Sequence, residues 1–221
     1  MGDWIYRPDL QEDWMSLVFL LNFMIVMILN KLVSGRLKSL LNIFKPRIYL
    51  SKYSHDRELN FFTYFNLLCF VLIISALSLT YFSLSIYSKR PLEFSFEFYY
   101  LILGMGIVLF FRYLLFQIIS MNLGFNKYIL LIVYKNFTFA SQASFFLVGI
   151  IFLWNYSSLP TIIYEGLILL LLGFWLANQF SLFFSFFKSH SRELIYIILY
   201  LCTFKIAPWI WVYLVFIETE L

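Results

Sequence analysis

The sequence predicts an all-α integral membrane protein: six transmembrane helices and a short cytoplasmic amphipathic helix in a single membrane domain over residues 1–221. Composition is the first observation, because 62% of the residues are hydrophobic and only 13% are charged, whereas soluble domains carry about 25% charged residues. The second is a mean hydropathy of +0.85. The third is a set of six apolar segments, each near the length of about 20 residues that a spanning helix needs.

The six predicted spans follow one another with short polar connections. The fourth is the weakest, because Asn136, Ser141 and Gln142 interrupt it, and an alternative is that it begins as an interfacial helix near Tyr128. Trp14 and Trp154 lie at span ends, where an amphipathic ring is favoured. The predicted spans are 14–33, 61–87, 96–119, 134–154, 161–187 and 194–216.

The N-terminal residues 1–13 are acidic, with Asp3, Asp9, Glu12 and Asp13. A secretory signal begins with basic residues and ends in a small-residue cleavage site. We therefore expect the first apolar segment to stay in the protein as a span.

Lysine and arginine are distributed unequally between the two sets of loops, and this bias sets orientation. Arg7, Lys89 and Arg90 lie on one side, and Arg112 and Lys205 lie within spans. The remaining eleven of the sixteen cations are Lys31, Arg36, Lys38, Lys45, Arg47, Lys52, Arg57, Lys127, Lys135, Lys188 and Arg192. The bias predicts that both termini are periplasmic. Since the net charge of +4 is mostly this asymmetry, we expect no nucleic-acid partner.

The first cytoplasmic loop, 34–60, contains apolar residues at helical spacing after Ser34, a plausible N-cap, and Pro46 ends or kinks the helix. We expect this helix to lie in the inner leaflet with its cations on anionic headgroups. The alternative is a plain loop that obeys the charge bias. The apolar positions are Leu37, Leu40, Leu41, Phe44 and Ile48, and the predicted lipid contacts are Arg36, Lys38, Lys45, Arg47 and Lys52.

Lys205 lies in the middle of the sixth span. A cation at that depth costs about 3 kcal/mol on insertion scales, so it needs a partner, water or another subunit. Pro208 frees the backbone carbonyl of Phe204 nearby. Glu165 is the best partner within the chain, although its depth differs by roughly 13 Å at 1.5 Å per residue. A structural ion pair, a ligand or proton site and a subunit contact all stay open.

Arg112 lies in the third span, about 10 Å from its cytoplasmic end. Gln117, Asn178 and Gln179 are candidates for a polar seam with it. Such a seam serves either helix association or a transport path.

Motifs for catalysis are missing from the sequence: it has no HExxH, no glycine-rich phosphate loop and no GxSxG. His55 and His190 are too few for a metal cluster, and Cys69 and Cys202 lie inside apolar segments. We expect a protein that is not an enzyme, with no cofactor and no metal site.

The run ILYLCTFKIAPWIWVY, residues 198–213, resembles the C-terminal signature of a six-span family of the Bacteroidota catalogued as domain of unknown function 4271. That signature looks like ILYLC-x-L-E-I-x-P. The start at Asp13-Trp14, the basic loop and the stretch FFRYLLFQIIS around Arg112 are also similar. Lys205 stands where the family tends to carry glutamate, which favours packing or partner contact over proton transfer.

The resemblance implies the inner membrane of a Gram-negative envelope and makes a role near the secretion and gliding apparatus plausible. We therefore expect a non-enzymatic subunit or assembly factor that acts through helix–helix contacts. Its expected partners are membrane lipids and other integral membrane or periplasmic proteins. The alternative is a small transporter or channel that uses Lys205, Arg112 and Glu165. A lipid-modifying enzyme is a third possibility, but no candidate base or metal supports it.

The first prediction concerns Lys205. Because Lys205→Leu removes the cost of burying a charge, membrane insertion and accumulation should be unchanged or improved. Immunoblotting of membrane fractions measures this. Failure of Lys205→Leu to accumulate while Lys205→Glu is tolerated would instead indicate an obligatory polar contact.

The second prediction concerns threading. A tag fused after Leu221 should be accessible to a membrane-impermeant reagent from the periplasmic side, because the basic loops hold the opposite side in the cytoplasm. Labelling only after the inner membrane is opened would contradict the six-span topology.

Overall fold

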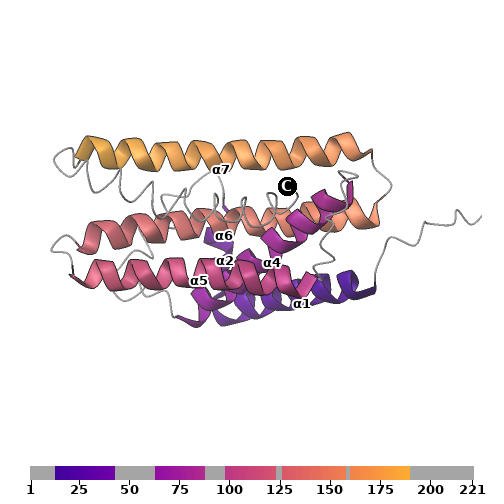
Figure 1. The fold of residues 1–221 in the computed structure, drawn as a ribbon, viewed down its shortest axis with the longest axis horizontal. Coiled ribbons are helices and arrows are strands. Elements are labelled where there is room, and N and C mark those ends of the chain that lie inside the picture. Colours follow the sequence, from indigo (N-terminus) through magenta and orange to yellow (C-terminus); the bar gives the residue numbers. More distant parts are fainter. Residues whose placement is uncertain (1–12, 43–62, 88–97, 123–125, 158–159, 190–221) are drawn as a thin grey trace, which may run out of the picture.

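The computed structural model describes residues 13–42, 63–87, 98–122, 126–157 and 160–189, and these residues form an all-helical bundle (Figure 1). The helices are α1 (Asp13–Leu32), α2 (Ser34–Leu40), α4 (Tyr64–Tyr87), α5 (Phe98–Asn122), α6 (Asn126–Tyr156) and α7 (Thr161–Ser189). The predicted all-helical class is therefore confirmed.

Four of these helices contain windows long and apolar enough to cross a membrane: Trp14–Leu32, Tyr64–Ser83, Val133–Tyr156 and Ile162–Ser181. A shorter apolar stretch, Phe98–Leu114, lies in α5. The chain is thus a membrane-embedded protein. Each of the first five predicted spans falls on one helix. The sixth, 194–216, lies outside the described residues, so the count of six stays a prediction.

Helix α6 is at the centre of the bundle. It packs against α1, α4, α5 and α7, and α5, α6 and α7 lie side by side while α4 runs obliquely across them (Figure 1). The helix is continuous from Asn126. Asn136, Ser141 and Gln142, which weaken the sequence signal, are all buried against neighbouring helices. They are polar because they face protein, where each can meet another polar group.

Aromatic side chains gather where α1 begins, α6 ends and α7 begins. The Trp14 ring stacks on Phe98 with 4.5 Å between centroids, and Trp154 stacks on Tyr164 at 5.8 Å. The Tyr164 hydroxyl also donates to the Leu153 carbonyl at 3.0 Å, which is a second bond to that carbonyl because it also accepts from the Ser157 N–H at 2.8 Å. We call this the aromatic end, and such rings are typical of a membrane–water interface.

The middle of the bundle is held by a buried polar contact between α1 and α4. The Ser75 hydroxyl donates to Asn22 Oδ1 at 2.5 Å, and Asn22 Nδ2 donates to the Val18 carbonyl at 2.8 Å. Both side chains are buried. In hydrocarbon neither could find water, so the pair fixes how the two helices meet.

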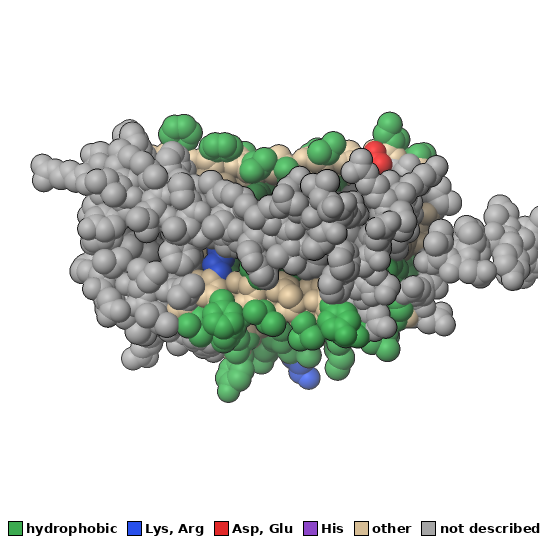
Figure 2. All heavy atoms as spheres, viewed as in Figure 1, with side chains coloured by type: hydrophobic (Ala, Val, Ile, Leu, Met, Phe, Trp, Pro, Cys, Tyr) green, Lys and Arg blue, Asp and Glu red, His purple; other side chains and the backbone are tan. Residues whose placement is uncertain are grey.

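Many large hydrophobic side chains of the described residues are exposed, and hydrophobic side chains predominate among those visible on the face that Figure 2 shows. On α7, Ile162, Leu169 and Leu170 are each about 70% exposed, at 73%, 68% and 70%. In water this surface would be an aggregation hazard, whereas in a bilayer it is a lipid-facing or partner-facing surface.

Helix α2 differs in detail from the predicted interfacial helix. Its N-cap is Val33 rather than Ser34, with no side-chain cap. Leu37 and Leu40 are buried in the protein core, so at these positions the apolar face packs against the bundle. The predicted apolar positions Phe44 and Ile48, with Pro46, lie outside the described residues.

Candidate functional site

A polar link joins α6 to α7. Gln179 Nε2 donates to Asn136 Oδ1 at 2.6 Å, and both side chains are buried. Asn136 uses its oxygen for this bond, which leaves its Nδ2 group as a further donor.

Aromatic rings pack α5 against α4 and α6 beside the Asn136–Gln179 hydrogen bond. The Tyr113 ring meets Phe70 of α4 at 5.8 Å and Phe137 of α6 at 5.6 Å, both edge to face. Phe137 follows Asn136 directly, and Arg112 precedes Tyr113. Arg112, Asn136 and Gln179 therefore lie at one level of the bundle, which we call the polar layer.

The depth of the polar layer follows from helix geometry. Tyr156, at the aromatic end, is twenty residues from Asn136 along α6, which corresponds to roughly 30 Å at 1.5 Å per residue. The hydrocarbon core of a bilayer is also about 30 Å thick. Along α7, however, Tyr164 at the aromatic end is fifteen residues from Gln179, which corresponds to roughly 22 Å. The polar layer therefore lies roughly 20–30 Å from the aromatic end, in the opposite half of the bilayer, where a long arginine side chain can reach toward the interface.

Arg112 lines a cavity of about 240 Å³ between α4, α5, α6 and α7. Its Nε is buried and has no hydrogen-bond partner among the described residues. Its guanidinium lies 5.9 Å from the Tyr113 ring centroid. The other lining residues are Ile73, Leu77, Thr80, Leu109, Asn136, Ala140, Ala143, Ser144, Leu147, Ile168, Leu171, Leu172 and Trp175.

A second arginine, Arg36 of α2, is enclosed by protein. It is 5% exposed, and its Nη2 donates to the Tyr134 hydroxyl at 2.9 Å and lies 3.4 Å from Asn66 Oδ1. The guanidinium also lies 4.3 Å from the centroid of the Phe65 ring, a cation–π distance. These contacts fasten α2 to α4 and α6.

The expected lipid contact of Arg36 is therefore corrected, because its charged group points into the bundle and not toward headgroups. The reason is that α2 folds against α4 and α6, where polar side chains meet the guanidinium. Lys38 on the same helix is exposed. Lys45, Arg47 and Lys52 lie outside the described residues.

Gln142 of α6 makes a hydrogen bond at the C-terminal end of α2. Its Nε2 donates to the Leu40 carbonyl, which is one of the last carbonyls of that short helix and has no partner inside it. Its Oε1 is buried without a partner among the described residues.

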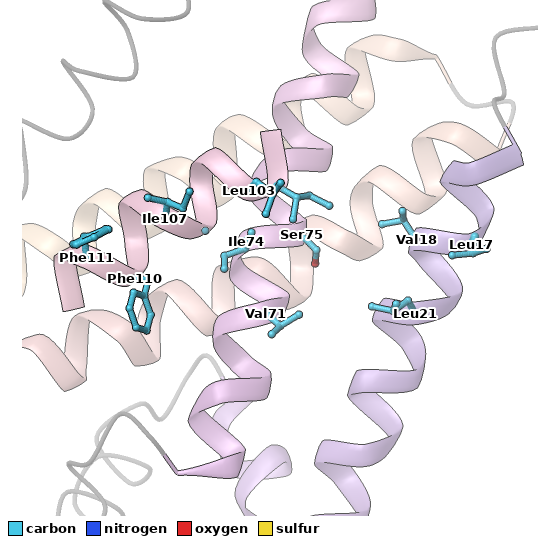
Figure 3. A pocket seen from close by; sticks show the side chains of 12 residues that line it. Leu17, Val18, Leu21, Val71, Ile74, Ser75, Leu103, Ile107, Phe110 and Phe111 are labelled. Carbon is cyan, nitrogen blue, oxygen red and sulfur yellow. The ribbon is translucent and has the colours of Figure 1, made fainter. Parts of the chain in front are cut away.

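A separate groove of about 480 Å³ lies between α1, α4 and α5 (Figure 3). Side chains of α1 and α5 stand on either side of Val71, Ile74 and Ser75 of α4, and the lining is almost wholly apolar. We call this the α1/α5 groove. Its walls are formed by Leu17, Val18 and Leu21 of α1 and by Ile102, Leu103, Gly106, Ile107, Phe110 and Phe111 of α5.

One glycine of α5, Gly106, lines this groove, and Gly104 lies two residues before it outside the lining. A Cβ built at Gly106 meets Ile74 Cδ1 at 3.6 Å, which is ordinary contact, and one built at Gly104 meets nothing within 4 Å. Glycine inside a helix costs about 1 kcal/mol relative to alanine. Crowding within the chain therefore does not explain these glycines.

Several predicted site residues are not brought together. Glu165 is exposed on α7, and Lys205 and Pro208 lie outside the described residues. Asn178 donates to the Phe174 carbonyl of its own helix at 3.0 Å and takes no part in the Asn136–Gln179 link, while the Gln117 side chain is not described. Within the described ranges no three His, Cys, Asp or Glu side chains converge.

Asn136 is a residue of the candidate site that the sequence alone did not single out. It was noted only as an interruption of the fourth span. A polar residue within an apolar helix is itself the signal, since it faces protein or a cavity rather than lipid.

Comparison with known proteins gives one match. A family model described as "Domain of unknown function (DUF4271)" matches residues 15–216. No curated protein matches the chain, and no solved structure matches it.

The third prediction tests the Arg36 contacts. Tyr134→Phe removes the hydroxyl that accepts from Arg36 and should lower the free energy of unfolding by about 1–2 kcal/mol, because the hydrogen bond involves a charged group. Unfolding of purified protein in mixed micelles by increasing SDS, followed by tryptophan fluorescence, measures it.

Tyr64→Phe is the matched control, because Tyr64 is 83% exposed at the start of α4. The double variant with Arg36→Met should lose less than the sum of the single losses, since both changes remove one contact. Equal stability of Tyr134→Phe and Tyr64→Phe would show that the contact contributes nothing.

Proposed function

The chain belongs to the DUF4271 family, and we propose that it is a non-enzymatic inner-membrane subunit or assembly factor of the bacterial cell envelope. It acts through helix–helix contacts with other envelope proteins. The observation that carries this proposal is the α1/α5 groove, which would receive an apolar transmembrane helix of a partner. Association with the secretion or gliding apparatus is the finer form of the proposal, and the family resemblance supports it.

The groove has the features of a helix-docking surface. Three helices contribute to it, and the α5 residues from Ile102 to Phe110 extend along it for roughly 12 Å at 1.5 Å per residue. Leu103 and Ile107 are 58% and 56% exposed, so they are available to a partner. Helix association within lipid depends on close packing rather than on a hydrophobic driving force.

A docked helix also accounts for Gly106 of α5. Small residues at a helix surface let a second backbone approach closely, and Gly106 is not required by crowding inside the chain. Flexible acyl chains could fill the groove as well, but they give no reason to keep glycine in a helix where alanine would be more stable.

Orientation in this proposal follows the charge bias. Lys31 and Lys38 are exposed where α1 ends and α2 follows, on the far side of the bundle from the aromatic end. Cationic residues there favour a cytoplasmic location for that side. Both termini are then periplasmic.

A small transporter or channel is the second candidate function, and the cavity beside Arg112 is the observation that favours it. An arginine at a cavity between helices is a possible ion or solute contact. The lining is mostly apolar, which favours the subunit proposal. A partner-free monomer whose melting temperature rises with a small anionic solute would support the transporter.

The fourth prediction tests the groove. A photo-crosslinking amino acid at Ile107 should give a discrete adduct with another integral membrane protein in living cells. Adding Leu103→Trp, which fills the groove, should reduce that adduct about tenfold, because the substitution occupies the space the partner helix needs. Quantitative mass spectrometry of the purified adduct measures both.

Leu169→Trp is the control for the substitution, because Leu169 is 68% exposed on α7 and away from the groove. It should leave the Ile107 adduct unchanged. Absence of any protein adduct at Ile107, or an adduct equally reduced by Leu169→Trp, would refute the docking function.

A further inference from the structure

The geometry points to a specific lipid site: the cavity beside Arg112 binds the phosphate headgroup of one anionic phospholipid. The lipid comes from the leaflet at the polar layer. This inference does not rest on the proposed function, because it concerns a different face of the bundle from the α1/α5 groove.

The charge of Arg112 is the first observation that supports a lipid site in this cavity. Arg112 Nε is buried without a hydrogen-bond partner in the described part of the chain. In a low-dielectric setting a guanidinium without an acceptor is costly. From Phe98 to Ser189 the sequence contains one acidic residue, Glu165. It lies fourteen residues from Gln179 along α7, roughly 21 Å away by helical rise, and so cannot be the counter-ion at the polar layer.

The donor set suits a phosphate. A guanidinium forms paired, charge-assisted hydrogen bonds with phosphate oxygens more readily than a point charge does. Asn136 lines the same cavity, and its Nδ2 group is a second donor, because its oxygen already accepts from Gln179. Ser144 and Thr80 are also in the wall, but their hydroxyls donate to Ala140 and Ala76 of their own helices.

The rest of the wall suits an acyl chain. Leu109, Leu147 and Leu171 line the cavity beyond the polar groups. Leu172 belongs to the wall and is also 50% exposed, so the apolar lining continues onto the outer surface of α7. A phospholipid therefore can place its phosphate on Arg112 while its chains stay in the bilayer. A purely hydrophilic solute would leave most of this wall uncovered.

Depth selects a lipid over a soluble anion. The polar layer lies roughly 20–30 Å from the aromatic end, in the half of the hydrocarbon core next to the opposite leaflet. From that depth a long arginine side chain can reach the headgroup phosphates of that leaflet. Phospholipid phosphate is present there at high local concentration. Basic pockets between transmembrane helices on the cytoplasmic side bind anionic headgroups in this way.

Native mass spectrometry of the full chain tests the site. Protein purified in mild detergent is mixed with phosphatidylglycerol or phosphatidylcholine, and the lipid-bound fraction is measured. We expect one phosphatidylglycerol per chain, bound in preference to phosphatidylcholine. Arg112→Gln should lower that retention about tenfold, as for loss of a charge-assisted pair. Arg112→Lys should give an intermediate value, because lysine keeps the charge and loses the paired geometry.

Lys31→Gln is the matched control, because Lys31 is an exposed cation on α1, outside the cavity, and its loss should not change retention. Ala143→Phe keeps Arg112 and fills the cavity, and it should also lower retention. Melting curves and size-exclusion profiles confirm that both cavity variants are folded, and a misfolded variant is replaced by Leu172→Trp in the same wall.

Three outcomes would overturn the inference. One is equal phosphatidylglycerol retention by Arg112→Gln and wild type. A second is a melting shift with inorganic phosphate or glycerol 3-phosphate as large as that with lipid, which would indicate a soluble-anion site. A third is a copurifying protein that is lost in Arg112→Gln while lipid retention is unchanged, since its carboxylate would then be the counter-ion.

Discussion

The absence of water from the bilayer core is the constraint on which this structure depends. A polar group placed among these helices is costly unless it finds a partner other than water. Asn22 and Ser75 pair across α1 and α4, and Gln179 and Asn136 pair across α6 and α7. Each pair fixes the register of two helices, which apolar side chains alone would leave free to slide. The polar residues of the spans therefore set the relative positions of the helices, although burying them costs free energy.

Helix α6 shows how far sequence reasoning reaches. Its existence and approximate limits follow from hydropathy, as they do for α1, α4, α5 and α7. The central position of α6 in the bundle does not follow from hydropathy. The polar residues through which α6 contacts its neighbours lower the hydropathy of its segment. Asn136 and Gln142 look like defects in a span until their partners, Gln179 and the Leu40 carbonyl, are known. Pairing between distant segments leaves no periodic signal in a single sequence.

The α2 helix shows a different limit of prediction from the sequence. Its periodicity and its cations predict an amphipathic helix at the inner surface, and the structure has a short helix over Ser34–Leu40. The sequence could not tell whether its apolar face meets lipid or protein, because leucine serves both. The structure places Leu37 and Leu40 in the core and draws Arg36 inward to Tyr134. Tyr134 and Phe65, far from Arg36 in sequence, decide that outcome.

The two arginines of the described bundle answer the same constraint in different ways. Arg36 lies among a tyrosine hydroxyl, an amide oxygen and an aromatic face, so its burial is compensated by protein and its role is to hold α2. Arg112 lies at about the same level, yet its Nε has no acceptor in the described chain and it borders a cavity. A charge retained there without an acceptor among the described residues supports the inference of an acceptor supplied from outside the chain. Within reach of a long arginine side chain in that half of the bilayer, phospholipid phosphate is the most abundant acceptor of that kind.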